Sequence, residues 1–396
     1  MQNKKTGVCI IIENLPVPVD RRVWQEALAL RDAGYRVSVI CPKARGFERS
    51  RETLEDIEVY RYRVREASGP LGYVVEYALA LAAQMRLALV VYARTRFRAL
   101  HACNPPDTTF LIGLFFKLFG VRFIFDHHDL NPELYEAKFG RRDFGYRLVC
   151  WAERLTFCTA DVSIATNESY REVARVRGKM PDDRVFVVRS CPDLARTRKG
   201  PAQPELKEGR RHLVVYLGVM GPQDGLDLLL ESIDLVVRRT QRRDILFVLI
   251  GAGTEAPRLK AIAAEKALEP LVKFPGHLSD EEVAAYLSTA DVGVAPDPAT
   301  AMNDKSTMNK IFEYMAFGLP IVLYDLTEGR RAAAEAALYA RPGDTEDFAQ
   351  KILRILDSES LRHELGARGR RRVEESLNWE IEKRSLLEAY AAALAG

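Results

Sequence analysis

Short apolar runs alternate with longer amphipathic stretches along the first half of the chain. Short apolar runs are typical of strands buried in a parallel sheet, whereas apolar residues every three or four positions are typical of helices that cover it. We therefore predict strands at 8–12, 37–40, 57–62, 99–102, 122–125, 162–165 and 185–188. Helices are predicted at 21–33, 73–93, 108–119 and 144–159, with Gly34 and Gly120 as C-terminal stops.

The same alternation begins again after residue 211. It predicts strands at 212–216, 246–250, 272–274, 292–295, 321–323 and 337–339, and helices at 225–240, 255–266, 280–289, 308–317 and 345–357. Between the two halves, residues 191–211 are rich in proline, charge and small side chains, which is typical of a linker. An amphipathic pattern at 378–394 predicts a final helix that packs back on the first half.

These patterns predict an α/β protein with two doubly wound, Rossmann-like domains, each a parallel sheet covered by helices. We expect the N-terminal domain at 1–192, joined by a C-terminal helix at 376–396, and the C-terminal domain at 211–375. Two such domains would face each other across a cleft. Because open parallel sheets bind ligands at the carboxyl ends of their strands, the cleft predicts a ligand shared by both domains.

Residues 303–320 read as a polar loop, a helix and a Gly-Leu-Pro stop before a new strand. A helix N-terminus attracts anions, and Ser306 or Thr307 is the expected N-cap. Lys310 and Glu313 are three residues apart and share one face of the helix. A cation and a carboxylate there suit a ligand with a ribose and a diphosphate. The alternative is an ordinary capped helix with a surface ion pair.

The composition is that of a soluble globular protein, because 47% of the 396 residues are hydrophobic and 29% are charged. The six cysteines include no Cys-x-x-Cys pair, which argues against a zinc site and a disulfide framework and fits a reducing cytosol. Lys4 and Lys5 lead directly into the first strand, so no secretory signal is expected. Polar side chains interrupt the apolar stretches at 73–92 and 110–125, so neither is expected to span a membrane.

Charge is distributed unevenly along the chain. Residues 1–190 carry 30 Lys and Arg against 23 Asp and Glu, a net charge of +7, whereas the remainder carries 28 against 32, a net charge of −4. Arginines at 94, 96, 98, 141, 142 and 147 suit the anionic headgroups of lipids. The alternative is a solvated arginine-rich surface. No basic and aromatic platform accompanies the charge, so no nucleic-acid partner is expected.

Several motifs occur in an order and spacing that resemble a known family. In the second half they are the runs at 216–225, 272–276 and 290–296 and the pattern Lys310-x-x-Glu313-x-Met315-Ala-x-Gly318-x-Pro320. In the first half they are the runs at 20–30, 33–42, 104–107 and 125–130. Together they cover essentially the whole chain and resemble the retaining GT-B glycosyltransferases of family 4, of the bacterial surface-polysaccharide type.

This resemblance implies metal-independent transfer of a sugar from a nucleoside diphosphate, without a cofactor. Glu313 would bind the donor ribose, and Lys310 with the backbone near Ser306, Thr307 and Asn309 would hold the diphosphate. The loop beneath would contain Gly218, Met220 and Gly221, and the segment with Phe274 and Gly276 would pack on the base. His128 would lie near the reacting sugar. We prefer it to His127, which is the alternative, because His128 directly precedes Asp129.

The chain departs from the family pattern at three places. Lys305 stands where many members have a second glutamate, and Val219 and Asp224 stand where many have an Arg and a Lys. The usual glycine pair of the first loop is replaced by residues 16–22. We therefore expect Lys305, Lys310 and either Arg21 or Arg22 to stabilise the leaving diphosphate. Asn104, Asp107 and Asp129 are expected on the acceptor side, and the alternative for the two aspartates is capping of loops.

The expected reaction is retaining transfer of a hexose from a UDP- or GDP-linked donor to a hydroxyl of an acceptor. The expected acceptor is a polyprenyl-diphosphate-linked saccharide, met by a cytoplasmic protein at the inner face of the plasma membrane. Two alternatives are a nucleotide-sugar epimerase on the same fold and a non-catalytic nucleotide-sugar-binding scaffold. A third, a dinucleotide-dependent oxidoreductase, rests on Gly251-Ala-Gly253 alone and lacks the third glycine and the acidic residue of that motif.

Overall fold

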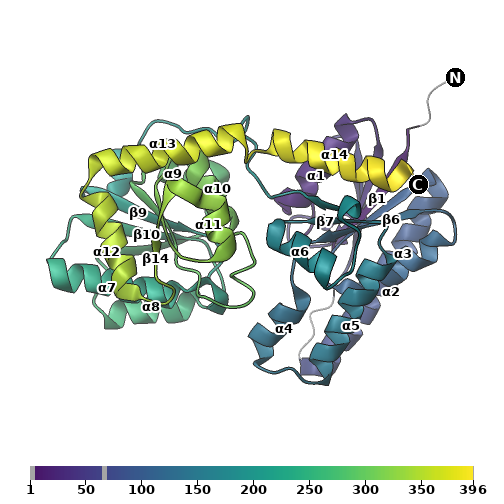
Figure 1. The fold of residues 1–396 in the computed structure, drawn as a ribbon, viewed down its shortest axis with the longest axis horizontal. Helices are drawn as coiled ribbons and strands as arrows, with labels where there is room; N and C mark the ends of the chain where they lie inside the picture. Colours follow the sequence, from purple (N-terminus) through teal and green to yellow (C-terminus); the bar gives the residue numbers. More distant parts are fainter. Residues whose placement is uncertain (1–4, 65–68, 396) are drawn as a thin grey trace. The chain divides into compact units, whose positions relative to one another are not determined.

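The computed structural model describes residues 5–64 and 69–395. Contacts divide the chain into two compact units (Figure 1). The N-terminal unit runs to Arg189 and takes in the residues from Glu382 onward, and the C-terminal unit is Ser190–Ile381. Residues 190–210 and 376–381 thus belong to the C-terminal unit. The last helix, α14 (Trp379–Ala395), begins in one unit and ends in the other.

The N-terminal unit contains an eight-stranded sheet in the order β3-β4-β2-β1-β5-β6-β7-β8. Its strands are β1 (Gly7–Ile11), β2 (Arg36–Pro42), β3 (Arg51–Leu54), β4 (Ile57–Tyr62), β5 (Ala99–Cys103), β6 (Arg122–His127), β7 (Val162–Ala165) and β8 (Val185–Val187). All pairs are parallel except β3 with β4, so the predicted parallel sheet is confirmed. The sequence missed β3 because this edge strand is polar and largely exposed, and its pairing with β4 defines it.

Helices cover both faces of this sheet. They are α1 (Arg21–Asp32), α2 (Gly69–Thr95), α3 (Phe110–Lys117), α4 (Asn131–Phe139), α5 (Phe144–Thr159) and α6 (Glu168–Val176). The sequence did not predict α4 and α6. The signal for α6 was present: the Asn167 side chain accepts a hydrogen bond from the Tyr170 amide and caps the helix.

The C-terminal unit contains a six-stranded parallel sheet in the order β11-β10-β9-β12-β13-β14. Its strands are β9 (His212–Leu217), β10 (Ile245–Ile250), β11 (Val272–Gly276), β12 (Val292–Ala295), β13 (Ile321–Tyr324) and β14 (Ala337–Ala340). Its helices are α7 (Leu226–Thr240), α8 (Ala256–Glu265), α9 (Asp280–Thr289), α10 (Asn309–Ala316), α11 (Thr327–Ala333), α12 (Thr345–Leu356) and α13 (Glu359–Glu375). The expected doubly wound fold of both halves is confirmed.

The sequence also missed α13, because glycines rather than large apolar residues form much of its buried face. A Cβ atom on Gly366 would lie 2.3 Å from the Gly318 carbonyl oxygen, so the helix can approach the end of α10 only with glycine there. Glycine lowers intrinsic helix propensity, which hides such a helix from pattern analysis.

The expected N-cap of α10 was wrong. The helix begins at Asn309 with Met308 as its N-cap, and no side chain caps it. Ser306 and Thr307 lie in the preceding loop, where their hydroxyl groups donate to the Met302 carbonyl at 2.9 Å and to Glu328 at 3.3 Å. The first amides of α10 are therefore left without a side-chain cap.

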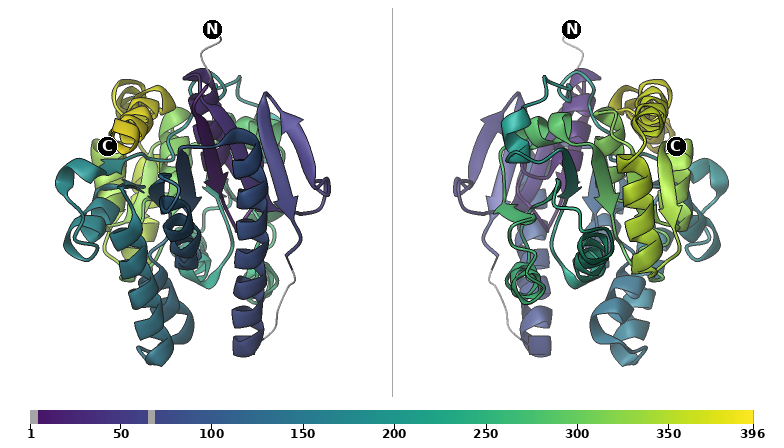
Figure 2. Two further views of the ribbon diagram at one scale, coloured as in Figure 1. Left: turned by 90° about the vertical axis from the view of Figure 1, so that its right-hand side faces the viewer. Right: turned by 90° about the vertical axis from the view of Figure 1, so that its left-hand side faces the viewer.

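The long helix predicted at 73–93 is confirmed as α2, which extends a few residues further at both ends (Figure 2, blue). By length and composition alone, 75–95 could span a membrane, contrary to the expectation from Glu76, Gln84 and Arg86. One face of α2 nevertheless packs in the core of its unit through Ala80, Leu87, Ala88 and Val91. The opposite face exposes Val75, Tyr77, Leu79, Leu89 and Val90.

Candidate functional site

The predicted donor-side residues of the C-terminal unit gather at the carboxyl edge of its sheet. From β9 the chain runs outward through β10 to β11, and from β12 it runs the opposite way to β14. The border between β9 and β12 is therefore the topological switch point, where open parallel sheets bind ligands. The loop after β9, the loop after β12 and the start of α10 all lie at this edge.

Lys310 is the buried cation of this site. Its side chain is 7% exposed, and its Nζ atom donates to Asp297 Oδ1 at 2.9 Å. The same Nζ atom lies 4.7 Å from the centre of the Tyr216 ring. A Cβ atom on Gly218 would lie 3.3 Å from Lys310 Cε, so the glycine lets the loop after β9 pass close to the lysine. Asp297, which the sequence analysis did not identify, is thus the present partner of Lys310.

The loop after β9 is held by two neighbouring glycines. A Cβ atom on Gly251 would lie 1.8 Å from the Gly218 carbonyl oxygen, and one on Gly253 would lie 2.3 Å from the Met220 carbonyl oxygen. Gly251-Ala-Gly253 is therefore explained by packing against Gly218 and buried Met220, not by a dinucleotide. Hydrogen bonds that cross this contact join Gly218 to Ile250 and Met220 to Ala252.

Asp224 adds a second carboxylate beside Lys310. Its Oδ2 atom accepts a hydrogen bond from the Gly221 amide at 2.9 Å and so fixes the turn after β9. Burial raises the pKa of Asp224, although attraction to Lys310 opposes that rise. Asp224 thus holds the turn after β9 in place, at a position where many family members have a lysine.

Two adjacent residues, Asn303 and Asp304, anchor the loop that carries Lys305, Ser306 and Thr307. Asn303 Nδ2 donates to the carbonyl oxygens of Gln223 at 2.9 Å and Pro298 at 3.0 Å. Asp304 accepts hydrogen bonds from the amide and hydroxyl of Thr327 at the start of α11. Lys305 is partly buried in this fixed loop, four residues before α10.

The remaining donor-side residues lie on α10 and β11. Asn309 is exposed at the first position of α10, and Glu313 is partly buried one turn later. Phe274 is partly buried and packs against the core, and the Gly276 carbonyl accepts a hydrogen bond from the Gly251 amide at 2.9 Å. β11 therefore ends beside the same glycine that supports the loop after β9.

In the N-terminal unit, His128 directly follows β6 and belongs to a buried polar cluster. Its Nε2 atom lies 2.5 Å from Asp126 Oδ2 and 3.0 Å from Arg22 Nε. Arg22 Nη2 donates to Asp126 Oδ1 at 2.9 Å and forms an ion pair with Glu26 at 3.2 Å. Arg22 Nη1 also donates to the Val188 carbonyl at 2.7 Å. Arg21, in contrast, is exposed.

The charges of this cluster follow from burial and pairing. Burial alone would raise the pKa of Asp126, but Arg22 and hydrogen bonds from His101 and His128 hold that pKa well below its usual value. Burial and the nearby Asp126 charge raise the pKa of Glu26 well above its usual value. Arg22 therefore faces two buried carboxyl groups, Asp126 with a lowered pKa and Glu26 with a raised one.

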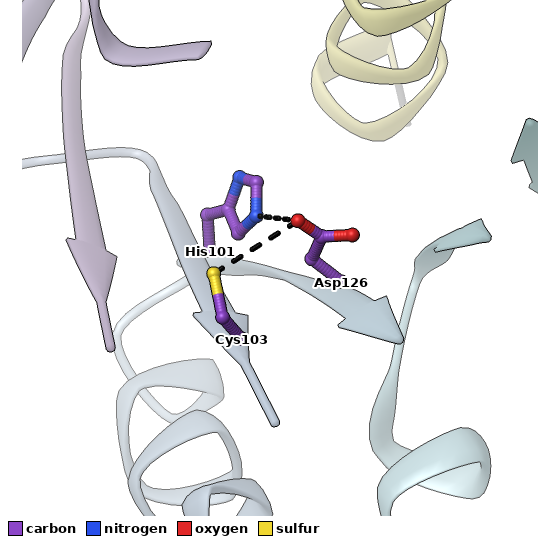
Figure 3. A group of neighbouring side chains, drawn as sticks. All are labelled: His101, Cys103 and Asp126. Carbon is purple, nitrogen blue, oxygen red and sulfur yellow. Dashed lines mark hydrogen bonds and ion pairs between the residues drawn. The ribbon is translucent and has the colours of Figure 1, made fainter. Parts of the chain in front are cut away.

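His101, Cys103 and Asp126 meet at one point in this cluster (Figure 3) and, within the described chain, are the group whose spacing suits a metal ion. These residues do not fit a metal. Both oxygens of Asp126 already accept hydrogen bonds, and the Arg22 guanidinium occupies the position of a counter-cation. Burial also raises the pKa of the Cys103 thiol well above its usual value, so the sulfur keeps its proton.

Two predicted acceptor-side residues hold the loop that follows β6. Asn104 Oδ1 accepts from the amides of His128 at 2.7 Å and Asp129 at 3.1 Å. Asp107 in turn accepts from Asn104 Nδ2 at 2.9 Å and from Asn131 Nδ2 at 2.7 Å. Within residues 5–64 and 69–395, no hydrogen bond or ion pair engages the Asp129 carboxylate. Of the three, Asp129 is the residue left for a ligand.

His127 lies on the other side of β6, in the core. Its ring stacks on Phe125 and contacts Phe157 and Tyr170. Burial lowers the pKa of His127 to about 3, so the ring is neutral at all physiological pH values. The structure therefore separates the two histidines, with one in the apolar core and one in the polar cluster.

The structure brings forward three residues that the sequence analysis did not select, namely His101, Asp126 and Asp297. Each is a polar side chain within or directly after an apolar strand, where a buried polar group requires a partner. That requirement was a usable signal, but the sequence did not reveal the partners.

A cavity of about 790 Å³ lies at the C-terminal end of α10, bordered by Arg362 and Arg370. These arginines donate to carbonyls that end α12 and α10, so we assign them structural roles.

Two family models match the chain. The model for "Glycosyl transferase 4-like domain" matches residues 19–191, and the model for "Glycosyl transferases group 1" matches residues 211–358. An MMP α-(1→4)-mannosyltransferase of Mycolicibacterium hassiacum is 28% identical over 49% of this chain and 46% of its own length. A GDP-mannose-dependent monoacylated α-(1-6)-phosphatidylinositol monomannoside mannosyltransferase of Corynebacterium glutamicum is 24% identical over 46% of this chain and 50% of its own. The chain spans about half the length of these relatives.

Solved structures share the fold over nearly the whole chain. A sucrose-phosphate synthase from Thermosynechococcus elongatus has a TM-score of 0.81 at 20% identity, covering 99% of this chain and 100% of its own. A protein from Anabaena, solved in complex with UDP and glucose, has a TM-score of 0.75 at 15% identity, covering 97% of this chain and 99% of its own. These likenesses establish the fold alone.

Proposed function

Because the chain belongs to the family 4 glycosyltransferases and has their GT-B fold, we propose that it transfers a hexose from a nucleoside-diphosphate sugar to a hydroxyl group, with retention of anomeric configuration. Both UDP and GDP remain candidates for the leaving group. A related fold from Anabaena was solved with UDP, and a relative from Corynebacterium is described as GDP-mannose-dependent.

The observation that carries this proposal is the position of Lys310. It is a buried cation at the second residue of α10, beside uncapped amides and at the switch point of the sheet. Helix N-termini bind phosphate groups through such amides and through the helix dipole. On donor binding, Lys310 would exchange Asp297 for the diphosphate, and Lys305 would add a second cation. Glu313, one turn along α10, would accept the ribose hydroxyls.

We propose a front-face displacement. The acceptor hydroxyl approaches the anomeric carbon from the side of the leaving group, and the bond between that carbon and the phosphate oxygen breaks as the new glycosidic bond forms. The departing phosphate oxygen takes the acceptor proton. His128 stabilises the transferred sugar, and Asp129, whose carboxylate has no partner in the described chain, binds an acceptor hydroxyl.

We propose a lipid-linked saccharide as the acceptor and a cytoplasmic protein that works at the inner face of the plasma membrane. The support is a set of exposed apolar side chains on α2, α3 and α5 of the N-terminal unit, which we call its apolar surface; Figure 1 labels these helices. Phe144 is 79% exposed, Leu148 54% and Trp151 57%, and their spacing puts them on one face of α5. Exposed residues of α3 and its end are Leu111, Leu114, Leu118 and Phe119.

Arginines flank this apolar surface. Arg147 and Arg154 are exposed on α5 and Arg141 and Arg142 just before it, while Arg86 and Arg94 are exposed on α2. Aromatic and aliphatic side chains bordered by arginines suit an interface with anionic lipid, because the apolar groups enter the headgroup region and the guanidinium groups pair with phosphates.

The donor can be tested by a thermal-shift screen of UDP, GDP and their sugars, followed by product analysis by NMR. A ligand at 100 times its dissociation constant stabilises the folded state by about 2.7 kcal/mol. We expect one nucleotide to stabilise the protein, and the product to keep the anomeric configuration of the donor. Stabilisation by none of them would contradict donor binding, and an isomerised donor without acceptor would favour an epimerase instead.

Membrane binding can be tested with the native fluorescence of Trp151. The chain has three tryptophans, and Trp24 and Trp379 are only 8% and 6% exposed. We expect vesicles of phosphatidylglycerol to shift the emission to the blue and vesicles of phosphatidylcholine to have a smaller effect. A Trp151→Phe variant should abolish the shift but not the binding. Absence of binding to either vesicle would argue for a soluble acceptor.

A further inference from the structure

A chain of polar contacts runs from α14 through the buried cluster to His128. The Tyr390 hydroxyl lies 2.8 Å from His101 Nδ1, and His101 Nε2 lies 3.3 Å from Asp126 Oδ2 (Figure 3 shows the second contact). Asp126 Oδ2 then lies 2.5 Å from His128 Nε2. All of these side chains belong to the N-terminal unit, and His101, Asp126 and Tyr390 are fully buried.

The direction of each hydrogen bond in this chain follows from the donors available. Burial raises the pKa of Tyr390 and lowers that of His101, so the hydroxyl keeps its proton and the imidazole ring carries one. Without a proton on Nε2, the ring would present a lone pair to the Asp126 carboxylate 3.3 Å away, which only accepts. We therefore place the proton on Nε2, and the Tyr390 hydroxyl then donates to Nδ1 at 2.8 Å.

The same argument fixes the proton of His128. Asp126 is ionised, so the contact of 2.5 Å requires a proton on His128 Nε2. Arg22 Nε, 3.0 Å from the same nitrogen, cannot donate to it once that nitrogen carries a proton. Arg22 instead neutralises Asp126 through its contact of 2.9 Å with Oδ1. Arg22 and His128 therefore both donate to the Asp126 carboxylate.

We propose that Asp126, oriented by Arg22 and by the His101–Tyr390 pair, is a positioning residue that fixes His128 in the Nε2–H tautomer. Nδ1 of His128 is then the ring nitrogen available to a ligand, as an acceptor when the ring is neutral and as a donor when it is protonated. The tautomer follows from the contacts and the charge of Asp126 and does not depend on the proposed function. The action of Nδ1 on the transferred sugar rests on the proposed function.

The decisive variant is Asp126→Asn. The Arg22 guanidinium has only donors, so the new amide must turn its oxygen toward Arg22 and its NH₂ group toward His128. That NH₂ group needs an acceptor, so Nε2 must lose its proton and Nδ1 must gain it. We expect the His128 tautomer to reverse, with a loss of turnover of about 10²-fold, within the range for loss of one polar group that stabilises the transition state. Binding of nucleoside diphosphate should be unchanged.

Tautomers can be read from imidazole nitrogen shifts of the full-length protein labelled with ¹⁵N-histidine, which has six histidines to assign. Wild-type His128 should show protonated Nε2 and unprotonated Nδ1 in its neutral form. In Tyr390→Phe, His101 should no longer be restricted to one tautomer, and turnover should fall only a few-fold. Tyr35→Phe is the matched control, because its ring contacts Tyr390 but its hydroxyl is outside the chain of contacts.

A protonated Nδ1 in wild-type His128, or an unchanged tautomer in Asp126→Asn, would overturn the proposal. If Asp126→Asn does not fold, the wild-type shifts and Tyr390→Phe still decide it. A protein with the expected tautomer that transfers no sugar would instead contradict the proposed function and leave the positioning role of Asp126 intact.

Discussion

The two units place a cation at the same position, the second residue of a helix that starts at the carboxyl edge of a parallel sheet. In α1 this residue is Arg22, and in α10 it is Lys310. Arg22 contacts Asp126, Glu26, His128 and the Val188 carbonyl. For Lys310 the described ionic partner is Asp297, and a tyrosine ring lies beneath it.

The difference between these cations indicates different tasks. A guanidinium that satisfies several groups at once is fixed in place and can fix others, as the planar fork of arginine allows. An ammonium group with one carboxylate partner can exchange that partner for a diphosphate at little geometric cost. We therefore expect Arg22 to organise its site and Lys310 to bind the donor.

The units also differ in the apolar surface that they leave exposed. Of 19 large hydrophobic side chains that are exposed in the described residues, 18 belong to the N-terminal unit and one, Val219, to the C-terminal unit. Among the described residues, the C-terminal unit thus buries nearly all of its large apolar side chains. The N-terminal unit exposes many of them and so has a surface suited to an apolar partner.

The largest expected effect comes from removing the cation of the C-terminal unit. Lys310→Met should lower kcat/KM by about 10³-fold, the upper range for loss of one charge-stabilising donor. It should also destabilise the fold by about 3 kcal/mol, because Asp297 is left buried without its partner. Initial rates and urea unfolding measure the two effects.

The double variant Lys310→Met with Asp297→Asn is the control for that experiment. It removes the unpaired charge, so stability should largely return while turnover stays low. Full recovery of turnover in the double variant would show that Lys310 acts only as the partner of Asp297.

Lys305→Ala tests whether Lys310 is the only cation of the C-terminal unit that acts on the diphosphate. Lys305 stands where many members of the family have a glutamate. We expect a loss of turnover of about 10²-fold if this lysine stabilises the leaving diphosphate. The free energy of unfolding should change less than in Lys310→Met, because Lys305 is only partly buried. Unchanged kinetics with a verified donor would remove Lys305 from the site.

The apolar surface of α5 can be removed without touching the core. The triple variant Phe144→Ser, Leu148→Ser and Trp151→Ser should weaken binding to phosphatidylglycerol vesicles about tenfold, since partial burial of each side chain contributes about 0.5 kcal/mol. Val176→Ser is the matched control, because Val176 is 67% exposed on α6 of the same unit. Vesicle sedimentation measures both. Equal binding by the triple variant and the control would exclude α5 from the interface.

The smallest expected effect is on the pH dependence of the N-terminal unit. Burial raises the pKa of Glu13 to about 7 against an ordinary value of 4.5, although a hydrogen bond from Gln84 opposes the rise. The folded state therefore binds this proton more tightly than the unfolded state. Its contribution to stability is fully present below pH 4.5 and is lost as the pH rises through 7.

Glu13→Gln should remove this dependence. Between pH 5 and pH 8, we expect the unfolding free energy to decrease by about 1 kcal/mol less in the variant than in the wild type. This figure allows for the partial exposure of Glu13. Glu55→Gln, at an exposed position, should leave the dependence unchanged. Calorimetry across this range measures both, and parallel curves for wild type and Glu13→Gln would contradict the shift.

Much of the fold was predictable because buried parallel strands and amphipathic helices have strong local patterns. Two of the elements that escaped prediction, β3 and α13, lack such patterns. β3 is a polar edge strand that is defined by its pairing with β4, and α13 packs through glycines whose role depends on the chain opposite them. The pairing of β3 is with the strand that directly follows it, whereas the position of α13 is set by a contact with a segment distant in sequence.

The candidate site divides in the same way. The chain by itself determined the doubly wound architecture, the family and the positions of Lys310, Glu313 and His128, because apolar periodicity and motif spacing are properties of neighbouring residues. Only the tertiary structure decided which groups face them. Asp297 meets Lys310 from 13 positions away, and Tyr390 reaches His101 across 289 positions. Partners of buried charges are chosen by proximity in space, which local sequence does not encode.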